Sequence, residues 1–392
     1  MFLEILLAIL LGVLAGCFTG LIPGVHVNLV ALTTVSFSSY LLGFVGLEFI
    51  LIFIISLSIT HSFLNVIPSI FLGAPEPSTA LSVLPGHALL MEGKGVDAVK
   101  LTLTGSLLGL LACFLLYPLL EFVVFYGYDL VEDYIGELLF VVGLFLIIRS
   151  GNLFVGFLAY SFAGFLGYLV LDSNISEPLF PLLSGLFGLS TLIFSLKSES
   201  GFPEQKKGSF SVSNVSSSVA LGSLSGFITA VLPGLGSSSA AAISSLFKKE
   251  NDREQFLVLI GSISTVNFFM SIAALNVIGK ARNGSVVAIQ SLISDPPLLF
   301  MIAASLIPAG FSIFLAGYLA RFFSRNMKVF NYEKIVYTVI VLIIFMTLLL
   351  SSFKGLFVLF LSTILGLYVN LKGLPRNILM SCIMVPVMIF FF

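Results

Sequence analysis

The chain has 392 residues, of which 58% are apolar, 13% are aromatic and 9% are charged. A soluble globular domain carries about 25% charged residues, so this composition excludes a soluble protein. The 18 Lys and Arg residues nearly balance the 19 Asp and Glu residues, and the net charge of -1 offers no basic surface for nucleic acid. We therefore expect a large membrane protein that does not bind nucleic acid.

Ten apolar runs are candidates for helices that cross a bilayer, which takes about 20 residues each. They cover about 49–72, 99–126, 136–149, 152–172 and 178–196, and then about 255–278, 297–322, 334–351, 353–371 and 375–392. The Gly, Ser, Pro and charged residues between the two sets are typical of a linker. The sequence predicts a first half over 1–197, a cytoplasmic linker over 198–214 and a second half over 215–392.

The two halves begin with similar sequences. LGVLAGCFTGLIPG, from Leu11 to Gly24, aligns without a gap with LGSLSGFITAVLPG, from Leu221 to Gly234, at an offset of 210 positions. Seven positions are identical, and both copies end in Pro-Gly. An ordered match of this kind at the start of each half indicates an internal duplication.

The charges of matched loops indicate how the two copies are oriented. The loops over 43–48 and 127–134 contain no Lys or Arg, whereas their counterparts over 248–254 and 321–334 contain three and four. Because cytoplasmic loops are enriched in Lys and Arg, we expect matched loops on opposite sides of the membrane.

The predicted fold is therefore an all-α polytopic membrane protein built as an inverted repeat. Each repeat has about five crossings and one re-entrant or broken-helix hairpin that turns at Pro-Gly, over 1–43 in the first repeat and 216–247 in the second. The loop assignments place the protein in the cell membrane with both termini outside.

The Pro-Gly turns predict a binding site. Irregular backbone at membrane depth is tolerated where it is buried in protein or lines a watery cavity, and the helix that begins after each turn directs unpaired N–H groups and its positive end at the bilayer centre. Two such helix ends suit an anion. The alternative is that Pro-Gly only kinks a helix. The predicted substrate-binding residues are Pro23, Gly24, Val25, His26 and Asn28 at the first turn, and Pro233, Gly234, Leu235, Gly236, Ser237 and Ser238 at the second.

Two further polar segments and one helix position complete the predicted site. The segment 73–100, assigned to the inner side, contributes Glu76, Ser78 and Thr79, and Ser78-Thr79 is placed to cap a following helix. A solvated surface loop is the alternative reading of that segment. Its counterpart in the second repeat, 279–285, contributes Lys280 and Arg282. Asn65 and Asn267, in the crossings that follow the hairpins, suit either a cavity or ordinary bonding between helices, and Asn267 is included in the site.

The sequence offers no enzyme and no metal site. The spacing of His26, His61 and His87 fits no helical metal motif, and no nucleophile elbow, phosphate-binding loop or dinucleotide motif occurs. A buried, hydrogen-bonded imidazole is the expectation for His61, whereas His26 is the candidate for a ligand or a proton-carrying group. The coupling ion of a carrier would be H+, or Na+ held by carbonyl and Ser oxygens at the turns.

GLIPGVHVN, VLPGLGSSSA and the GAPEPS…GH…EGKG segment together resemble the TctA-type family, the large membrane subunit of tripartite tricarboxylate transporters. The resemblance covers both halves and is strongest to shorter archaeal-type relatives. It implies an inverted-repeat carrier of organic anions that works with a small membrane subunit and an extracytoplasmic binding protein. It also implies that Pro23, Gly24, Pro233 and Gly234 form the backbone of the site. A more distant resemblance is to the polyprenyl-phosphate translocases.

The expected function is secondary active transport of a small organic anion, with a carboxylate favoured, bound mid-membrane between the two helix ends and moved by alternating access. The alternative is translocation of a polyprenyl phosphate, a lipid substrate. The expected partners are this anion or lipid phosphate, the membrane lipids and the two accessory subunits, and an oligomer is compatible with the sequence. A membrane scaffold without transport would instead have straight helices and no re-entrant turns.

Overall fold

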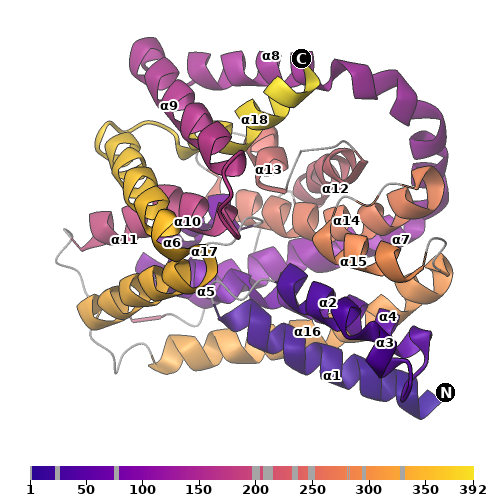
Figure 1. Ribbon diagram of the computed structural model, residues 1–392. Helices are drawn as coiled ribbons and strands as arrows, with labels where there is room; N and C mark the ends of the chain where they lie inside the picture. The colour runs from indigo at the N-terminus through magenta and orange to yellow at the C-terminus, as the bar shows by residue number, and fades with distance from the viewer. Residues whose placement is uncertain are drawn as a thin grey trace.

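The computed structural model describes residues 2–22, 27–74, 79–196, 204–205, 215–231, 237–245, 252–279, 281, 283–293, 297–326 and 332–392. Every regular element in these ranges is a helix (Figure 1). Seven of the helices there are long and apolar enough to cross a membrane. The predicted all-α polytopic membrane fold is confirmed.

The five crossings predicted in the first half coincide with helices. The α4–α5 span is interrupted at Asn65, because Pro68 has no N–H to donate to the carbonyl of Leu64. The elements are α1 (Phe2–Leu21), α2 (Val27–Ser36), α3 (Ser38–Leu41), α4 (Leu47–Leu64), α5 (Val66–Phe71), η1 (Ala80–Ser82), α6 (Val83–Met91), α7 (Gly95–Val131), η2 (Glu132–Tyr134), α8 (Ile135–Ile148), α9 (Leu153–Leu171), α10 (Leu179–Leu183), the π-helix η3 (Ser184–Leu189) and α11 (Ser190–Ser195).

In the second half the predicted crossings over 334–351 and 353–371 are two helices, which share the label α17. They meet at Ser352, where the backbone is not helical, with φ of 56° and ψ of -165°. The elements of this half are α12 (Val215–Val231), α13 (Ser237–Ser245), α14 (Arg253–Ile278), α15 (Gly284–Leu292), α16 (Leu298–Asn326), α17 (Tyr332–Leu371), η5 (Arg376–Met380) and α18 (Ser381–Phe391).

The helices α4 and α14 form the centre of the bundle. Both are buried along most of their length, whereas α1, α9, α16 and α17 expose much of their apolar surface. In Figure 1, α1 and α16 lie beside α4 at one side of the molecule, and α8, α9 and α18 lie together at the other. An apolar outer surface around a buried core is what a bilayer requires, because lipid rather than water covers it.

In the first half, α1 packs in parallel against α4. A Cβ placed on Gly12 would lie 2.5 Å from Cβ of Ser56, and one on Gly20 would lie 3.0 Å from Cβ of Leu64. The contacts advance in the same direction along both helices, so the two helices run in parallel. Glycine allows this close approach because a larger side chain would meet the neighbouring helix.

In the second half, α12 packs against α14 in the same way. A Cβ on Gly222 would lie 2.7 Å from Cβ of Ser262, and one on Gly226 would lie 2.9 Å from Cβ of Val266. Gly12 and Gly222 are matched positions of the repeated sequence motif. The motif therefore forms the same packing surface in both halves.

The helices α7 and α14 begin where α5 ends. A Cβ on Gly95, the first residue of α7, would lie 3.4 Å from the ring of Phe71, the last residue of α5. Glu92, shortly before α7, lies 2.7 Å from Arg253, the first residue of α14. The end of the α4–α5 span and the start of α14 therefore lie at the same end of the bundle.

The helix α16 fixes the direction of α14. It runs parallel to the α4–α5 span, as two contacts show. Ser312 Oγ donates to Thr60 Oγ1 of α4 at 3.1 Å, and further along the chain in both elements the rings of Phe323 and of Phe71 in α5 lie 5.9 Å apart. The chain must therefore return through α14 to the end at which α4 and α16 begin. It follows that α4 and α14 run in opposite directions.

Candidate functional site

Much of the predicted site lies outside the described residues. These predictions are Pro23, Gly24, Val25, His26, Pro233, Gly234, Leu235, Gly236, Glu76, Ser78, Lys280 and Arg282. The structure describes Asn28, Thr79, Ser237, the backbone of Ser238, and Asn267. The helices that enter and leave the two turns are described, and they border the predicted site.

Each hairpin enters and leaves the bundle at the same end, because its entering helix runs parallel to the central helix that follows it. Because α1 and α4 run in parallel, the chain that joins them returns through α2 to the end at which α1 begins. Gly20, the residue before the end of α1, faces Leu64, whereas the α4–α5 span continues to Phe71. The described end of α1 therefore stops short of the end of the α4–α5 span. The same argument holds for α12, α13 and α14, and the two hairpins enter from opposite ends because α4 and α14 run in opposite directions.

A buried Thr marks the last turn of each entering helix. Thr19, four positions before Pro23, lies 3.0 Å from Nδ1 of His61 on α4. Thr229, four positions before Pro233, accepts a hydrogen bond of 3.1 Å from Nδ2 of Asn267 on α14. Each entering helix is thus joined to its central helix by a matched polar pair in its last turn.

The first returning helix contacts the second half. Ser285 Oγ at the start of α15 donates to Asn28 Oδ1 at 3.3 Å, and a Cβ on Gly284 would lie 2.5 Å from Asn28 Cγ. The N–H of Asn283, which caps α15, donates to Ser271 Oγ of α14 at 2.8 Å. The predicted site residue Asn28 thus lies at the end of the 279–285 segment, whose sequence contains the predicted site residues Lys280 and Arg282.

The second returning helix lies against the first half. The helix α13 packs on η1, which follows the 73–79 segment. Thr79 occupies the N-cap position of η1, but its side chain makes no cap hydrogen bond. Its hydroxyl instead lies 2.6 Å from Ser69 Oγ of α5. The capping role predicted for Thr79 is wrong, because the adjacent helix offers a partner that the sequence does not show.

The predicted roles of the polar helix residues are partly resolved. Asn267 of α14 donates a hydrogen bond to Thr229 of α12. Of the two roles expected for Asn267, the structure therefore shows bonding between helices. His61 is buried and hydrogen-bonded, as the sequence indicated. The predicted site does not include Thr19 or Thr229, although both are identical positions of the repeated motif, which is the sequence signal for them.

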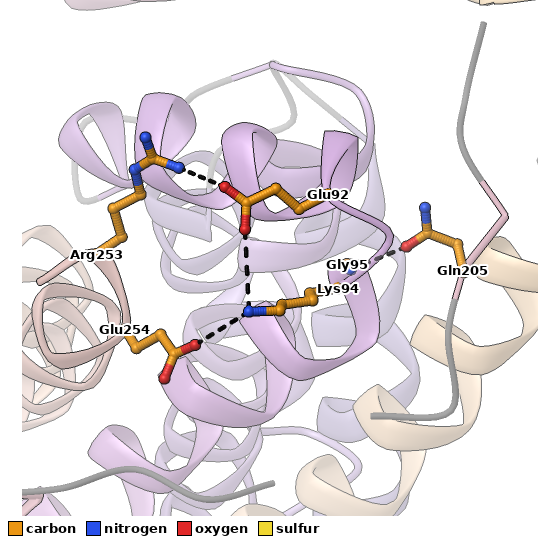
Figure 2. A network of polar contacts seen from close by, with 6 residues as sticks. All are labelled: Glu92, Lys94, Gly95, Gln205, Arg253 and Glu254. Atoms are coloured by element: carbon orange, nitrogen blue, oxygen red, sulfur yellow. Dashed lines mark hydrogen bonds and ion pairs between the residues drawn. The ribbon is translucent and has the colours of Figure 1, made fainter. Parts of the chain in front are cut away.

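A network of charged side chains joins the two halves at one end of the bundle (Figure 2). Besides the Arg253–Glu92 pair, Lys94 Nζ lies 3.9 Å from Glu92 and 3.7 Å from Glu254. Gln205 of the linker accepts a hydrogen bond from the Gly95 N–H and donates one to the Leu90 carbonyl, both at 2.9 Å. The loop before α7, the linker and the start of α14 therefore lie together.

The comparisons with known proteins identify a family and one relative. Residues 6–381 match the tripartite tricarboxylate transporter TctA family. An uncharacterized protein of Methanocaldococcus jannaschii is 30% identical over 325 residues, which is 80% of this chain and 79% of that protein. No solved structure matches.

Proposed function

The chain belongs to the tripartite tricarboxylate transporter TctA family, and we propose that it is a secondary active transporter of a small organic anion that carries carboxylate groups. The family is one of transporters rather than enzymes, and the buried core with its apolar surface is that of a multi-pass membrane protein. The substrate binds in the middle of the bundle in this proposal and is moved by alternating access between the two sides.

The observation that carries the proposal is the arrangement of the two hairpins. They enter the bundle from opposite ends, and each returning helix contacts a polar segment of the other half. Asn28 bonds with Ser285, and α13 packs on η1. An inverted repeat with helix ends that meet a shared site is typical of secondary transporters, because the N–H groups and positive ends of such helices attract anionic groups. The packing of α1 on α4 and of α12 on α14 supports this repeat.

The remaining parts of the proposal follow from the family and the sequence. The proposed partners are a small membrane subunit and an extracytoplasmic binding protein, and the proposed driving ion is H+ or Na+. The charged network around Glu92 and Arg253 is assigned to the cytoplasmic side of the cell membrane, with both termini outside, because Lys and Arg are enriched in cytoplasmic loops.

Transport by the purified protein in liposomes tests the proposal. Uptake of radiolabelled citrate, as a tricarboxylate probe, is expected in the wild type and is expected to be lost in a Gly24→Leu, Gly234→Leu double variant, because the added side chains fill both turns. Gly127→Ala is the control, since a Cβ there would meet no atom within 4 Å. Equal uptake by the wild type and the double variant would contradict the placement of the site.

The alternative of a lipid-phosphate translocase uses the same pair of helix ends. Membership of a tricarboxylate transporter family favours a soluble carboxylate over a lipid. The same liposomes decide between them, because movement of a labelled polyprenyl phosphate between leaflets, without citrate uptake, is the result that the alternative requires.

A further inference from the structure

The polar pairs at the base of the two turns are structurally equivalent but chemically different. His61 on α4 occupies the place that Asn267 occupies on α14, and each faces the matched Thr of the motif, Thr19 or Thr229. The two N···O distances are 3.0 Å and 3.1 Å. One half therefore uses an imidazole where the other half uses an amide.

The Thr hydroxyls have acceptors in their own helices. Thr19 Oγ1 lies 3.2 Å from the Gly16 carbonyl, and Thr229 Oγ1 lies 3.0 Å from the Ser225 carbonyl and 3.2 Å from the Gly226 carbonyl. A hydroxyl has a single hydrogen, so a Thr that donates within its own helix accepts from the other helix. In that arrangement Nδ1 of His61 is the donor of its pair, as Nδ2 of Asn267 is, whereas in the other tautomer Nδ1 accepts from Thr19.

An amide and an imidazole differ in one property at this position. Both supply the N–H that joins the helices, but only the imidazole binds a proton near neutral pH. In the charged imidazole both ring nitrogens carry a hydrogen, so Nδ1–H donates to Thr19 while the Thr19 hydroxyl donates to the Gly16 carbonyl. Protonation of His61 thus places a positive charge beside Thr19, four positions before Pro23 in the sequence, without breaking the pair.

We propose that His61 binds the coupling proton of the carrier, in a position whose counterpart Asn267 supplies the helix-joining bond alone. The inference rests on the proposed function, since it assigns the coupling ion of that same transport cycle. A proton on His61 and an anionic substrate at the turn stabilise each other, because opposite charges attract strongly in a buried site. The two are therefore moved together.

The proposal assigns to the substrate the negative charge that pairs with a protonated His61. The elements packed against α4 are α1, α2, α5, α14, α15 and α16. Among the titratable groups that the structure describes on these elements, Cys17 lies closest in sequence to Thr19. The two carboxylates described there, Glu4 and Glu254, are not buried. The titratable and charged side chains described on these elements are Glu4, Cys17, Arg253, Glu254, Tyr318, Arg321 and Arg325.

Two measurements on the full chain test the proposal. The first is an NMR titration of the reconstituted, histidine-labelled protein, with His26→Gln and His87→Gln variants to assign the signals. The titration runs from about pH 8 to about pH 5, and the His61 ring is expected to bind a proton more readily in the presence of citrate than in its absence, because the bound anion attracts the charged ring. A ring that stays neutral throughout this range, with and without citrate, overturns the proposal.

The second measurement is citrate uptake driven by an imposed proton gradient. His61→Asn copies the pair of the second half and is expected to keep the bond with Thr19, the melting temperature and the exchange of labelled for unlabelled citrate, but to lose accumulation driven by the gradient. Asn267→Ala is the control, in which uptake falls but keeps its dependence on the gradient. Unchanged gradient dependence in His61→Asn overturns the proposal. If the wild type takes up no citrate at all, the proposed function is contradicted. In that case the NMR titration by itself tests whether His61 binds a proton.

Discussion

Gly73 and Gly279 end equivalent helices with nearly the same backbone conformation, at φ values of 64° and 65°. Gly73 follows α5, and Gly279 caps α14 in the left-handed region, where its N–H donates to the Leu275 carbonyl at 3.0 Å. The two positions are 206 residues apart, the same separation as His61 and Asn267. The central helices of the two halves therefore end in the same manner, immediately before the segments assigned to the site.

Gly279→Ala is expected to destabilise the protein by about 1 kcal/mol, because an L side chain in the left-handed region meets its own backbone. A Cβ at this position would meet no other atom within 4 Å, so backbone strain alone is measured. Unfolding in detergent monitored by circular dichroism gives the change. Gly310→Ala in α16 is the matched control, because its Cβ also meets nothing within 4 Å and alanine stabilises a helix interior. Equal effects of the two changes would contradict the assigned strain.

Gly16→Val is expected to separate α1 from α4. A Cβ on Gly16 would lie 2.6 Å from the Leu57 carbonyl and 2.6 Å from Cβ of Thr60, so the helices must move apart. Overpacking of this kind costs about 1–3 kcal/mol. The displacement also pulls Thr19 from His61, so citrate uptake should fall together with the melting temperature. A valine variant with wild-type values of both would show that close packing of α1 is dispensable.

The apolar runs predict the positions of the helices well, because burial in lipid or protein requires the same side chains at any point of the fold. The ends differ where charged residues continue a helix. The apolar run predicted near residues 99–126 begins inside α7, which starts at Gly95. The first turns of this helix hold Asp97 and Lys100, which pair at 3.2 Å, so charged residues extend the helix beyond its apolar part. Polar residues at a helix end interrupt the apolar signal without ending the helix.

The pairing of His61 with Asn267 could not be predicted from the repeated motif. The motif aligns at an offset of 210, which would match His61 with Ser271, whereas the structure matches it with Asn267. The second hairpin is four residues shorter, and only the packing of α12 on α14 reveals the shift.

Arg376 is a second residue whose surroundings the sequence does not reveal. It is buried and donates to the Phe187 carbonyl and to Ser190 Oγ, at and beyond the π-helix of the other half. This contact joins residues almost 190 positions apart, and a π-helix has no clear sequence signal.

Gln205→Ala is expected to loosen the linker from the first half. The side chain joins the Gly95 N–H and the Leu90 carbonyl, and two partly buried neutral hydrogen bonds contribute about 1–2 kcal/mol. Cleavage within 198–214 by a limiting amount of protease should become faster. Gln205→Glu keeps the acceptor for Gly95 but loses the donor to Leu90, so an intermediate rate is expected. If both variants are cleaved at the wild-type rate, these contacts do not hold the linker.

The orientation of the helices predicts which single cysteines react from outside the cell. Cysteines at Glu92, Arg253 and Arg325 lie at the end of the bundle where α5 stops and α14 starts, and they should react with an impermeant thiol reagent only after permeabilisation. Cysteines at Gly46, before α4, and at Asp129, near the end of α7, should react in intact cells. The native Cys17, Cys113 and Cys382 are replaced first. If Gly46→Cys and Arg253→Cys react from the same side, α4 and α14 do not cross the membrane in opposite directions. The two hairpins would then not enter from opposite sides, and the proposed anion site between them would lose its support.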